Sequence, residues 1–290
     1  MTSQSQASVL ELFPKKGDAS EDARQLYLDL MKRCLADTIY QHVNPRSARH
    51  KHLGERVLFK MVRLAGYEVT DRDRPSFNTA ARSVGKDWPS KGHTMVGLAR
   101  LNNVQQCVED VIRNGVPGDL IETGVWRGGV TIFMRSILRA YNVTDRVVWA
   151  ADSFAGLPRP DVDQFPDDEG DPHHLHTELA VSLDEVKSNF ERYGLLDDQV
   201  RFLKGFFRDT LPNSPVRKLA VLRLDGDMYE STIESLEYLY PKLSRGGYVI
   251  VDDFSYPPCM KAVTDYRHRN GIVDPIIKID WSGVYWRRSM

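Results

Sequence analysis

The sequence has few cysteines and no excess of charge of either sign. Its 290 residues include three cysteines, Cys34, Cys107 and Cys259, which lie far apart and form no CxxC pair. Such spacing predicts neither a disulfide framework nor a zinc site, and it favours a protein located in the reducing cytoplasm. The 39 Lys and Arg nearly balance the 40 Asp and Glu, which gives a formal net charge of −1. This balance disfavours a protein that binds nucleic acid or an anionic membrane surface.

Long hydrophobic runs are also missing. No run approaches the roughly 18 apolar residues of a membrane span, and the first eight residues lack the basic start and apolar stretch of a signal peptide. We therefore expect a cytoplasmic protein with no membrane partner. The hydrophobic share of 41% is ordinary for a globular protein, so most of the chain should fold.

The N-terminal third is expected to be helical and irregular. Residues 1–20 are too polar to form a core and are predicted to be disordered. An apolar stripe predicts an amphipathic helix from about Glu21, and a second helix is expected at 57–66. Residues 67–94 contain Pro and Gly without periodicity, which indicates a long loop. We assign residues 21–93 to a helical cap.

From residue 94 to residue 290, short apolar runs alternate with helical patterns, which is typical of a parallel sheet covered on both faces. Five such strands are expected, at residues 119–122, 147–151, 200–203, 219–224 and 247–251. Two further runs, 276–280 and 283–288, are joined by a connection too short for a helical crossover, so they must be antiparallel. We predict an α/β, Rossmann-like sheet of seven strands, mostly parallel with an antiparallel last strand, which is the outline of the class I methyltransferase fold.

The turns after the first three strands carry residues suited to a nucleoside. Ligands of doubly wound sheets bind beyond the carboxyl ends of the strands. The first turn, ETGVWRGG (122–129), does not match the dinucleotide pattern GxGxxG, and its Glu122 suits the cationic, amine-bearing end of S-adenosylmethionine better than a pyrophosphate. Asp152 ends the second strand and can accept two hydrogen bonds from a ribose diol. After the third strand, Gly205 and either Phe206 or Phe207 are placed to bracket an adenine, although one of these rings is as well explained by core packing.

Acidic residues end the fourth and fifth strands. Because neighbouring parallel strands end at the same edge of a sheet, Asp225, Asp252 and Asp253 should converge. Clustered carboxylates repel unless something neutralises them, and an all-oxygen ligand set favours a hard cation, magnesium foremost. The alternative is that these carboxylates cap loops and bond backbone amides.

A bound cation would lower the pKa of an acceptor hydroxyl and would hold a vicinal diol in place while a carboxylate takes the proton. Asp225 is our candidate for both base and metal ligand. It is expected to lie between the turns that bind the nucleoside and the pair Asp252 and Asp253. Asp227 is its competitor, and the residues alone do not rank the two further.

A long segment between the second strand and Ser182 is rich in Pro, Gly and acidic residues. A loop of this length is either disordered or a functional lid. His173, His174 and His176 occur in it, but their spacing in a loop without Cys gives poor support for zinc. Contact with the substrate and a simple solvated loop are the other interpretations.

Four motifs in this order closely resemble the macrocin-type sugar O-methyltransferases, which methylate sugar hydroxyls of macrolide and related antibiotics. The motifs are ETGVWRGG (122–129), DSFAGLP (152–158), VLRLDGDMYEST (221–232) and GGYVIVDDF (246–254). The resemblance runs from about Thr94 to Arg288 and implies an S-adenosylmethionine-dependent methyltransferase domain at 94–290, magnesium dependence, a small-molecule glycoside substrate, and assembly into homodimers or homotetramers.

The resemblance also implies site residues. Asp225 would be the catalytic base and a metal ligand, with Asp252 and Asp253 as the remaining metal ligands. The residues expected to bind the methyl donor are Thr94, Met95, Glu122, Thr123, Gly124, Val125, Trp126, Asp152, Ser153, Phe154, Ala155, Gly156, Ser182, Gly205 and Phe206. The loop at 157–178 resembles the variable region that covers the sugar.

Three other functions are weighed against this one. A catechol or another vicinal-diol acceptor fits the same chemistry, because a metal contacts only two adjacent oxygens. A nicotinamide-dependent oxidoreductase shares the ribose-binding carboxylate but lacks its GxGxxG turn here. A catalytically silent binding protein is disfavoured by the three retained carboxylates.

Overall fold

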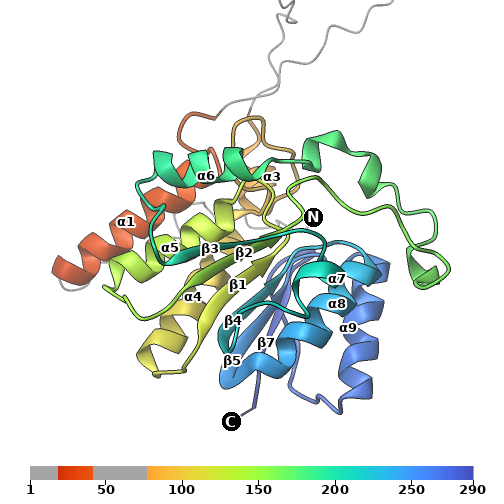
Figure 1. Ribbon diagram of the computed structural model, residues 1–290. Helices are drawn as coiled ribbons and strands as arrows, with labels where there is room; N and C mark the ends of the chain where they lie inside the picture. Colours follow the sequence, from red (N-terminus) through yellow and green to blue (C-terminus); the bar gives the residue numbers. More distant parts are fainter. Residues whose placement is uncertain (1–18, 42–76, 290) are drawn as a thin grey trace, which may run out of the picture.

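The described residues form a seven-stranded sheet with helices on both faces (Figure 1). The computed structural model describes residues 19–41 and 77–289. The expected helix at 57–66 and the expected disorder of residues 1–18 lie outside the described residues, whereas residues 19 and 20, also expected to be disordered, begin helix α1. The strands are β1 (Asp119–Thr123), β2 (Val148–Asp152), β3 (Val200–Lys204), β4 (Leu219–Leu224), β5 (Leu243–Val251), β6 (Ile277–Lys278) and β7 (Val284–Arg287). Their order is β3-β2-β1-β4-β5-β7-β6.

Strand direction confirms the predicted topology. β1 to β5 pair in parallel, whereas β7 runs antiparallel to both β5 and β6. The strand order reverses between β1 and β4, which places the open crevice of the sheet beyond the carboxyl ends of these two strands. Asp152 ends β2 there, and Asp225 and Asp252 directly follow β4 and β5.

Helices cover the two faces separately. On one face lie α1 (Ala19–Leu35), α4 (Leu98–Arg113), α5 (Gly129–Ala140) and α6 (Leu183–Arg192). On the other lie the short α7 (Phe207–Thr210), α8 (Tyr229–Leu239) and α9 (Pro257–Arg269) (Figure 1). Successive residues of β1 serve the two faces in turn: Leu120 belongs to the core under α4 and α5, and Ile121 to the core under α8 and α9. This two-sided burial explains why the strands read as continuous apolar runs.

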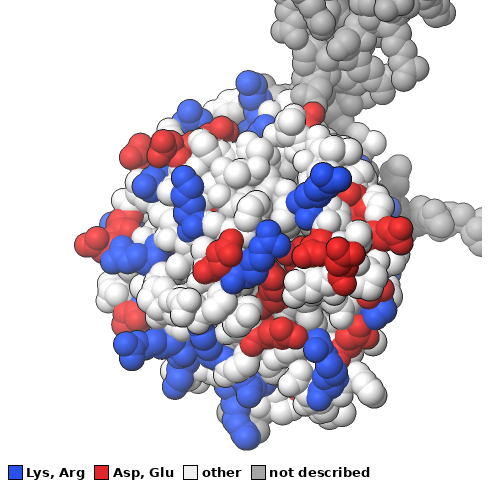
Figure 2. Space-filling model, turned by 45° about the vertical axis from the view of Figure 1, so that its right-hand side comes forward, with Lys and Arg blue, Asp and Glu red and all other residues white. Residues whose placement is uncertain are grey.

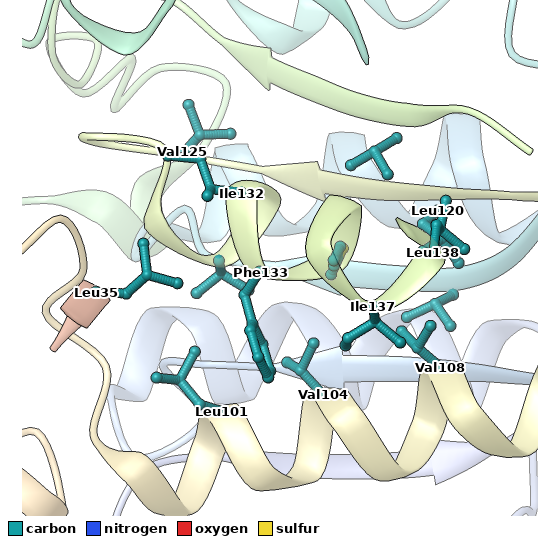
Figure 3. Packing of buried hydrophobic residues seen from close by; sticks show 14 of the residues in the cluster. Leu35, Leu101, Val104, Val108, Leu120, Val125, Ile132, Phe133, Ile137 and Leu138 are labelled. Atoms are coloured by element: carbon teal, nitrogen blue, oxygen red, sulfur yellow. The ribbon is translucent and has the colours of Figure 1, made fainter. Parts of the chain in front are cut away.

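The described part of the N-terminal cap shares the core of the sheet. In Figure 3, Phe133 and Ile137 of α5 point toward Leu101 and Val104 of α4, with Leu35 of α1 at the end of the same cluster. Leu28 and Leu35 are fully buried in that cluster. Burying a leucine side chain contributes roughly 1.5–3 kcal/mol, so α1 is held by packing rather than by its own helix propensity.

Two expectations about loops are corrected. The predicted loop at 67–94 contains the short helix α3 (Thr79–Ser83), whose N-terminal N–H of Ala81 donates to the Asn78 side chain. The segment after β2 holds three 3-10 turns, η2 (Pro166–Asp168), η3 (His173–Leu175) and η4 (Thr177–Leu179). Periodicity misses both because segments of three to five residues are too short for an amphipathic pattern to repeat. Across residues 19–41 and 77–289, no helix combines the length and apolarity needed to cross a membrane.

Candidate active site

A cleft opens at the carboxyl ends of the strands, where the switch in strand order places it. Its volume is about 710 Å³, including the solvent at its mouth. Of the residues expected to bind the donor or act in catalysis, the cleft is lined by Met95, Gly124, Trp126, Asp152, Ser153, Gly156, Phe206 and Asp225. Seven of the fifteen predicted donor contacts and the predicted base therefore meet in one cavity, although they come from five separate segments of the chain.

The turn after β1 passes directly beside the end of β4. Gly124 has a φ of +83°, and a Cβ atom at this position would lie 1.7 Å from the backbone oxygen of Asp225. A side chain therefore cannot be accommodated without separating the two strands. The close approach leaves this part of the cleft floor as bare backbone, which a flat or charged ligand can contact closely.

Asp152 is held rigidly at the end of β2. One carboxylate oxygen accepts the N–H of Val125 at 2.7 Å, and the other accepts the N–H of Phe154 at 2.7 Å. Burial raises the pKa of Asp152, while these backbone donors act in the opposite direction by stabilising the charged form. Because each oxygen has a second lone pair, the carboxylate can still accept hydrogen bonds from a ribose diol.

The remaining predicted donor contacts lie behind the cleft wall or beside it. Val125 and Phe154 act through the backbone N–H groups just described, and Ser182 caps α6 by accepting the N–H of Glu185 at 3.2 Å. Thr94 accepts the N–H of Val96 at 3.2 Å. Those that do not line the cleft are Thr94, Glu122, Thr123, Val125, Phe154, Ala155, Ser182 and Gly205.

Glu122, expected to contact the donor amine, does not line the cleft and instead pairs with groups inside the sheet. Its carboxylate pairs with Arg223 at 2.5 Å and accepts the hydroxyl of Thr131 at 2.9 Å, and the residue is 2% exposed. Burial raises the pKa of Glu122 to about 8, although Arg223 opposes this shift. Glu122 therefore acts on the site indirectly, by pairing with Arg223, which also contacts Asp225.

Arg223 joins the carboxylates of three adjacent strands. It is completely buried within β4, and its guanidinium contacts Glu122 at the end of β1, Asp225 at 2.7 Å, and Asp252 after β5. A second buried guanidinium, that of Arg100 in α4, contacts the other oxygen of Asp252. The sequence did not single out either arginine; for Arg223 the available signal was a charged residue inside the otherwise apolar strand LAVLRL.

The three predicted metal ligands converge. Asp225, Asp252 and Asp253 each offer one oxygen, and these oxygens all lie within 4.8 Å of one another. In the part of the chain that the structure describes, arginines pair with Asp225 and Asp252 but no ion pair involves Asp253. Burial and the neighbouring carboxylates hold the pKa of Asp253 well above its usual range. An all-oxygen set with one uncompensated carboxylate fits a hard divalent cation.

Asp227 lies at the same rim and lines the cleft. Its φ of +57° is rare for a residue other than glycine, and such backbone strain concentrates at functional sites. Burial and the charge of Asp225 raise the pKa of Asp227 to about 7. Figure 2, which turns the side of α8 and α9 toward the viewer, shows acidic side chains across the middle of this face. The rim of the cleft therefore favours a cation.

Helix α8 supplies cleft residues that the sequence analysis did not single out. Glu230, Ser231 and Glu234 line the cavity from this helix. Burial and the charge of Glu230 raise the pKa of Glu234 to about 7. Spacing of three and four residues along a helix places these side chains on one face, but nothing local indicates that this face borders the cleft.

Comparison with known proteins finds similar sequences over most of the chain. The profile of the macrocin O-methyltransferase family (TylF) matches residues 24–288. The 8-demethyl-8-(2,3-dimethoxy-alpha-L-rhamnosyl)-tetracenomycin-C 4'-O-methyltransferase of Streptomyces olivaceus is 52% identical over 93% of this chain and 95% of its own length. Mycinamicin III 3''-O-methyltransferase of Micromonospora griseorubida is 50% identical over 91% of this chain and 97% of its own length.

Solved structures show the same relationship. The structure of the O-methyltransferase NovP covers 92% of this chain and 100% of its own, with 49% identity and a TM-score of 0.80. The calicheamicin methyltransferase CalS11, at 17% identity and a TM-score of 0.53, shares the fold. The chain therefore belongs to the macrocin O-methyltransferase (TylF) family, and it is an S-adenosylmethionine-dependent O-methyltransferase.

Proposed function

We propose that this enzyme methylates a deoxysugar hydroxyl of a glycosylated natural product, in macrolide-type antibiotic biosynthesis, with the help of a magnesium ion. The observation that carries the proposal is the convergence of Asp225, Asp252 and Asp253 beside the donor cleft. The names of relatives support the acceptor class: one methylates a rhamnosyl tetracenomycin and another methylates mycinamicin III.

The residues that would hold the donor are those on the floor of the cleft. Asp152 would accept the ribose hydroxyls, the backbone at Gly124 allows the closest approach, and Met95 and Trp126 provide apolar walls. Bound S-adenosylmethionine supplies a methyl group on a positively charged sulfur. The carboxylate-rich rim is suited to a cationic donor because opposite charges attract in a poorly solvated cleft.

Asp225, Asp252 and Asp253 would hold the magnesium ion. The ion, when bound, lowers the pKa of an acceptor hydroxyl and fixes two adjacent oxygens. Arg223 and Arg100 hold Asp252 from both sides, so its position is set before any cation arrives. This arrangement reduces the reorganisation that binding requires.

Asp225 would act as the base. Burial and the charge of Asp252 raise the pKa of Asp225, which makes its carboxylate a better proton acceptor near neutral pH. In a direct displacement the hydroxyl oxygen forms a bond to the methyl carbon as the carbon–sulfur bond breaks, and the hydroxyl proton passes to Asp225. Asp227, two residues further on, remains the competing base.

Three measurements test the proposal. Calorimetry with S-adenosylhomocysteine should give binding heat, and no heat at millimolar ligand would refute the donor site. EDTA should stop methyl transfer and added Mg²⁺ should restore it; an enzyme indifferent to both would refute the metal role. An acceptor panel of mycinamicin III, demethyldecarbamoylnovobiocin and simple catechols should show product with the glycosides, and product with catechols alone would favour the vicinal-diol alternative.

We also expect a homodimer or homotetramer, which size-exclusion chromatography with light scattering will test.

A further inference from the structure

The acidic segment after β2 is anchored by two buried aspartates. Asp168 is 0% exposed, and its carboxylate accepts the N–H groups of Tyr229 at 2.7 Å and Glu230 at 2.9 Å at the start of α8. A negative charge at this end of a helix is stabilised by the helix dipole. The loop is therefore fixed beside the cleft rim, rather than being a simple solvated connection.

The second aspartate holds a histidine. Asp171, with a side chain 1% exposed, accepts the Tyr256 hydroxyl at 3.0 Å and lies 2.8 Å from Nδ1 of His173. The edge of the Tyr256 ring packs against the imidazole, with the ring centres 5.2 Å apart. A carboxylate partner requires Nδ1 to carry a hydrogen, so Nε2 is the nitrogen left for another group.

Nε2 of His173 faces Asp227 across a short gap. The distance from Nε2 to the nearer carboxylate oxygen is 4.0 Å, and both side chains are just over one quarter exposed. This distance is too long for a direct hydrogen bond, but it allows one oxygen atom to make hydrogen bonds of about 2.8 Å to both groups. A hydroxyl in this gap can donate its hydrogen to the Asp227 carboxylate, and its oxygen can accept a hydrogen bond from Nε2–H when both ring nitrogens carry hydrogens.

We propose that His173 and Asp227 together bind a hydroxyl of the acceptor next to the one that is methylated, with Asp171 as the residue that positions His173. This inference rests on the proposed function, because it assumes that the acceptor lies at the carboxylate rim. It also favours a sugar over a catechol as the acceptor. A sugar ring offers a further hydroxyl beside the metal-bound pair, whereas an unsubstituted catechol has no oxygen for this contact.

A matched pair of variants separates a substrate contact from a loop anchor. His173→Asn places an amide near the Nδ1 position, so it keeps the bond to Asp171 and removes the group that faces Asp227. His173→Gln does the reverse. We expect His173→Asn to lower kcat/KM for the glycoside roughly 10- to 100-fold, the effect of losing one hydrogen bond to a charged group. Its melting temperature and S-adenosylhomocysteine affinity should stay at wild-type values, and His173→Gln should retain more activity than His173→Asn.

The assay uses whichever of mycinamicin III and demethyldecarbamoylnovobiocin the wild-type enzyme methylates. His268→Asn, at an exposed position in α9, is the control and should match the wild type. In an Asp227→Asn background, His173→Asn should cost less than it does alone, because the two groups hold one hydroxyl. Wild-type kcat/KM for His173→Asn, or full additivity with Asp227→Asn, would overturn the inference alone. No methylation of either glycoside by the wild type would instead overturn the proposed acceptor class and, with it, this contact.

Discussion

Replacing Arg223 with methionine should destabilise the protein strongly. The guanidinium is completely buried and contacts Glu122, Asp225 and Asp252. Removing one partner of a buried ion pair leaves an uncompensated charge and costs about 3–5 kcal/mol. Since 1 kcal/mol changes the melting temperature by about 2–4 °C in a domain of 150–250 residues, a fall of roughly 6–20 °C is expected.

Urea unfolding followed by circular dichroism measures this effect. Arg201→Met is the matched control, because Arg201 is exposed on strand β3 of the same sheet; it should change the free energy of unfolding by about 0.5 kcal/mol or less. Adding Glu122→Gln to Arg223→Met should recover part of the loss by removing one orphaned charge. Magnesium should stabilise Arg223→Met more than the wild type, because the cation replaces part of the missing positive charge. If Arg223→Met unfolds at the same urea concentration as Arg201→Met, the electrostatic role assigned to Arg223 is wrong.

Three further variants test other parts of the site. Asp225→Asn should reduce turnover at least about 100-fold, the usual contribution of a general base, while S-adenosylhomocysteine still binds in calorimetry; retained turnover would favour Asp227 as the base. Gly124→Ala should abolish that binding, since its Cβ would meet the backbone of Asp225, whereas Gly115→Ala, with a similar φ of +62° and nothing within 4 Å, should keep it. Burial, assisted by Arg192 and Arg127, lowers the pKa of His93, so the folded state disfavours its charged form. The contribution of His93 to the free energy of unfolding should therefore be constant above pH 6.5 and fall as the pH drops below it. In urea titrations from pH 8 to 5, the stability of the wild type relative to His93→Gln should fall with the pH; a difference that does not change with pH would contradict the assignment.

The sheet and its ligand edge could be predicted from local patterns. Asp225, Asp252 and Asp253 were placed together because parallel strands end at one edge of a sheet, and the structure brings their oxygens within 4.8 Å. The turn glycines and Asp152 were found in the same way, from their positions directly after strands. These predictions succeed because each depends on the element that the residue itself terminates.

Contacts between distant segments could not be predicted in this way. Nothing near Glu122 in the sequence indicates that Arg223, 101 positions later, binds its carboxylate. Likewise, Asp168 is one of several acidic loop residues in the sequence, and only the structure shows that the N–H of Tyr229, 61 positions later at the start of α8, donates to its carboxylate. His173 could be read from sequence only as a loop histidine, since its orientation depends on Asp171 and Tyr256 together.

The sequence by itself therefore determined the strands and their directions, the class of fold and the edge of the sheet that carries the candidate site. Hydrophobic periodicity and strand ends are local properties, and chain connectivity limits the topologies that they allow. Tertiary structure alone decided which charges are buried, which are paired, and which face the cleft. A buried charge is stable only with its partners in place, and those partners are set by packing across the whole sheet.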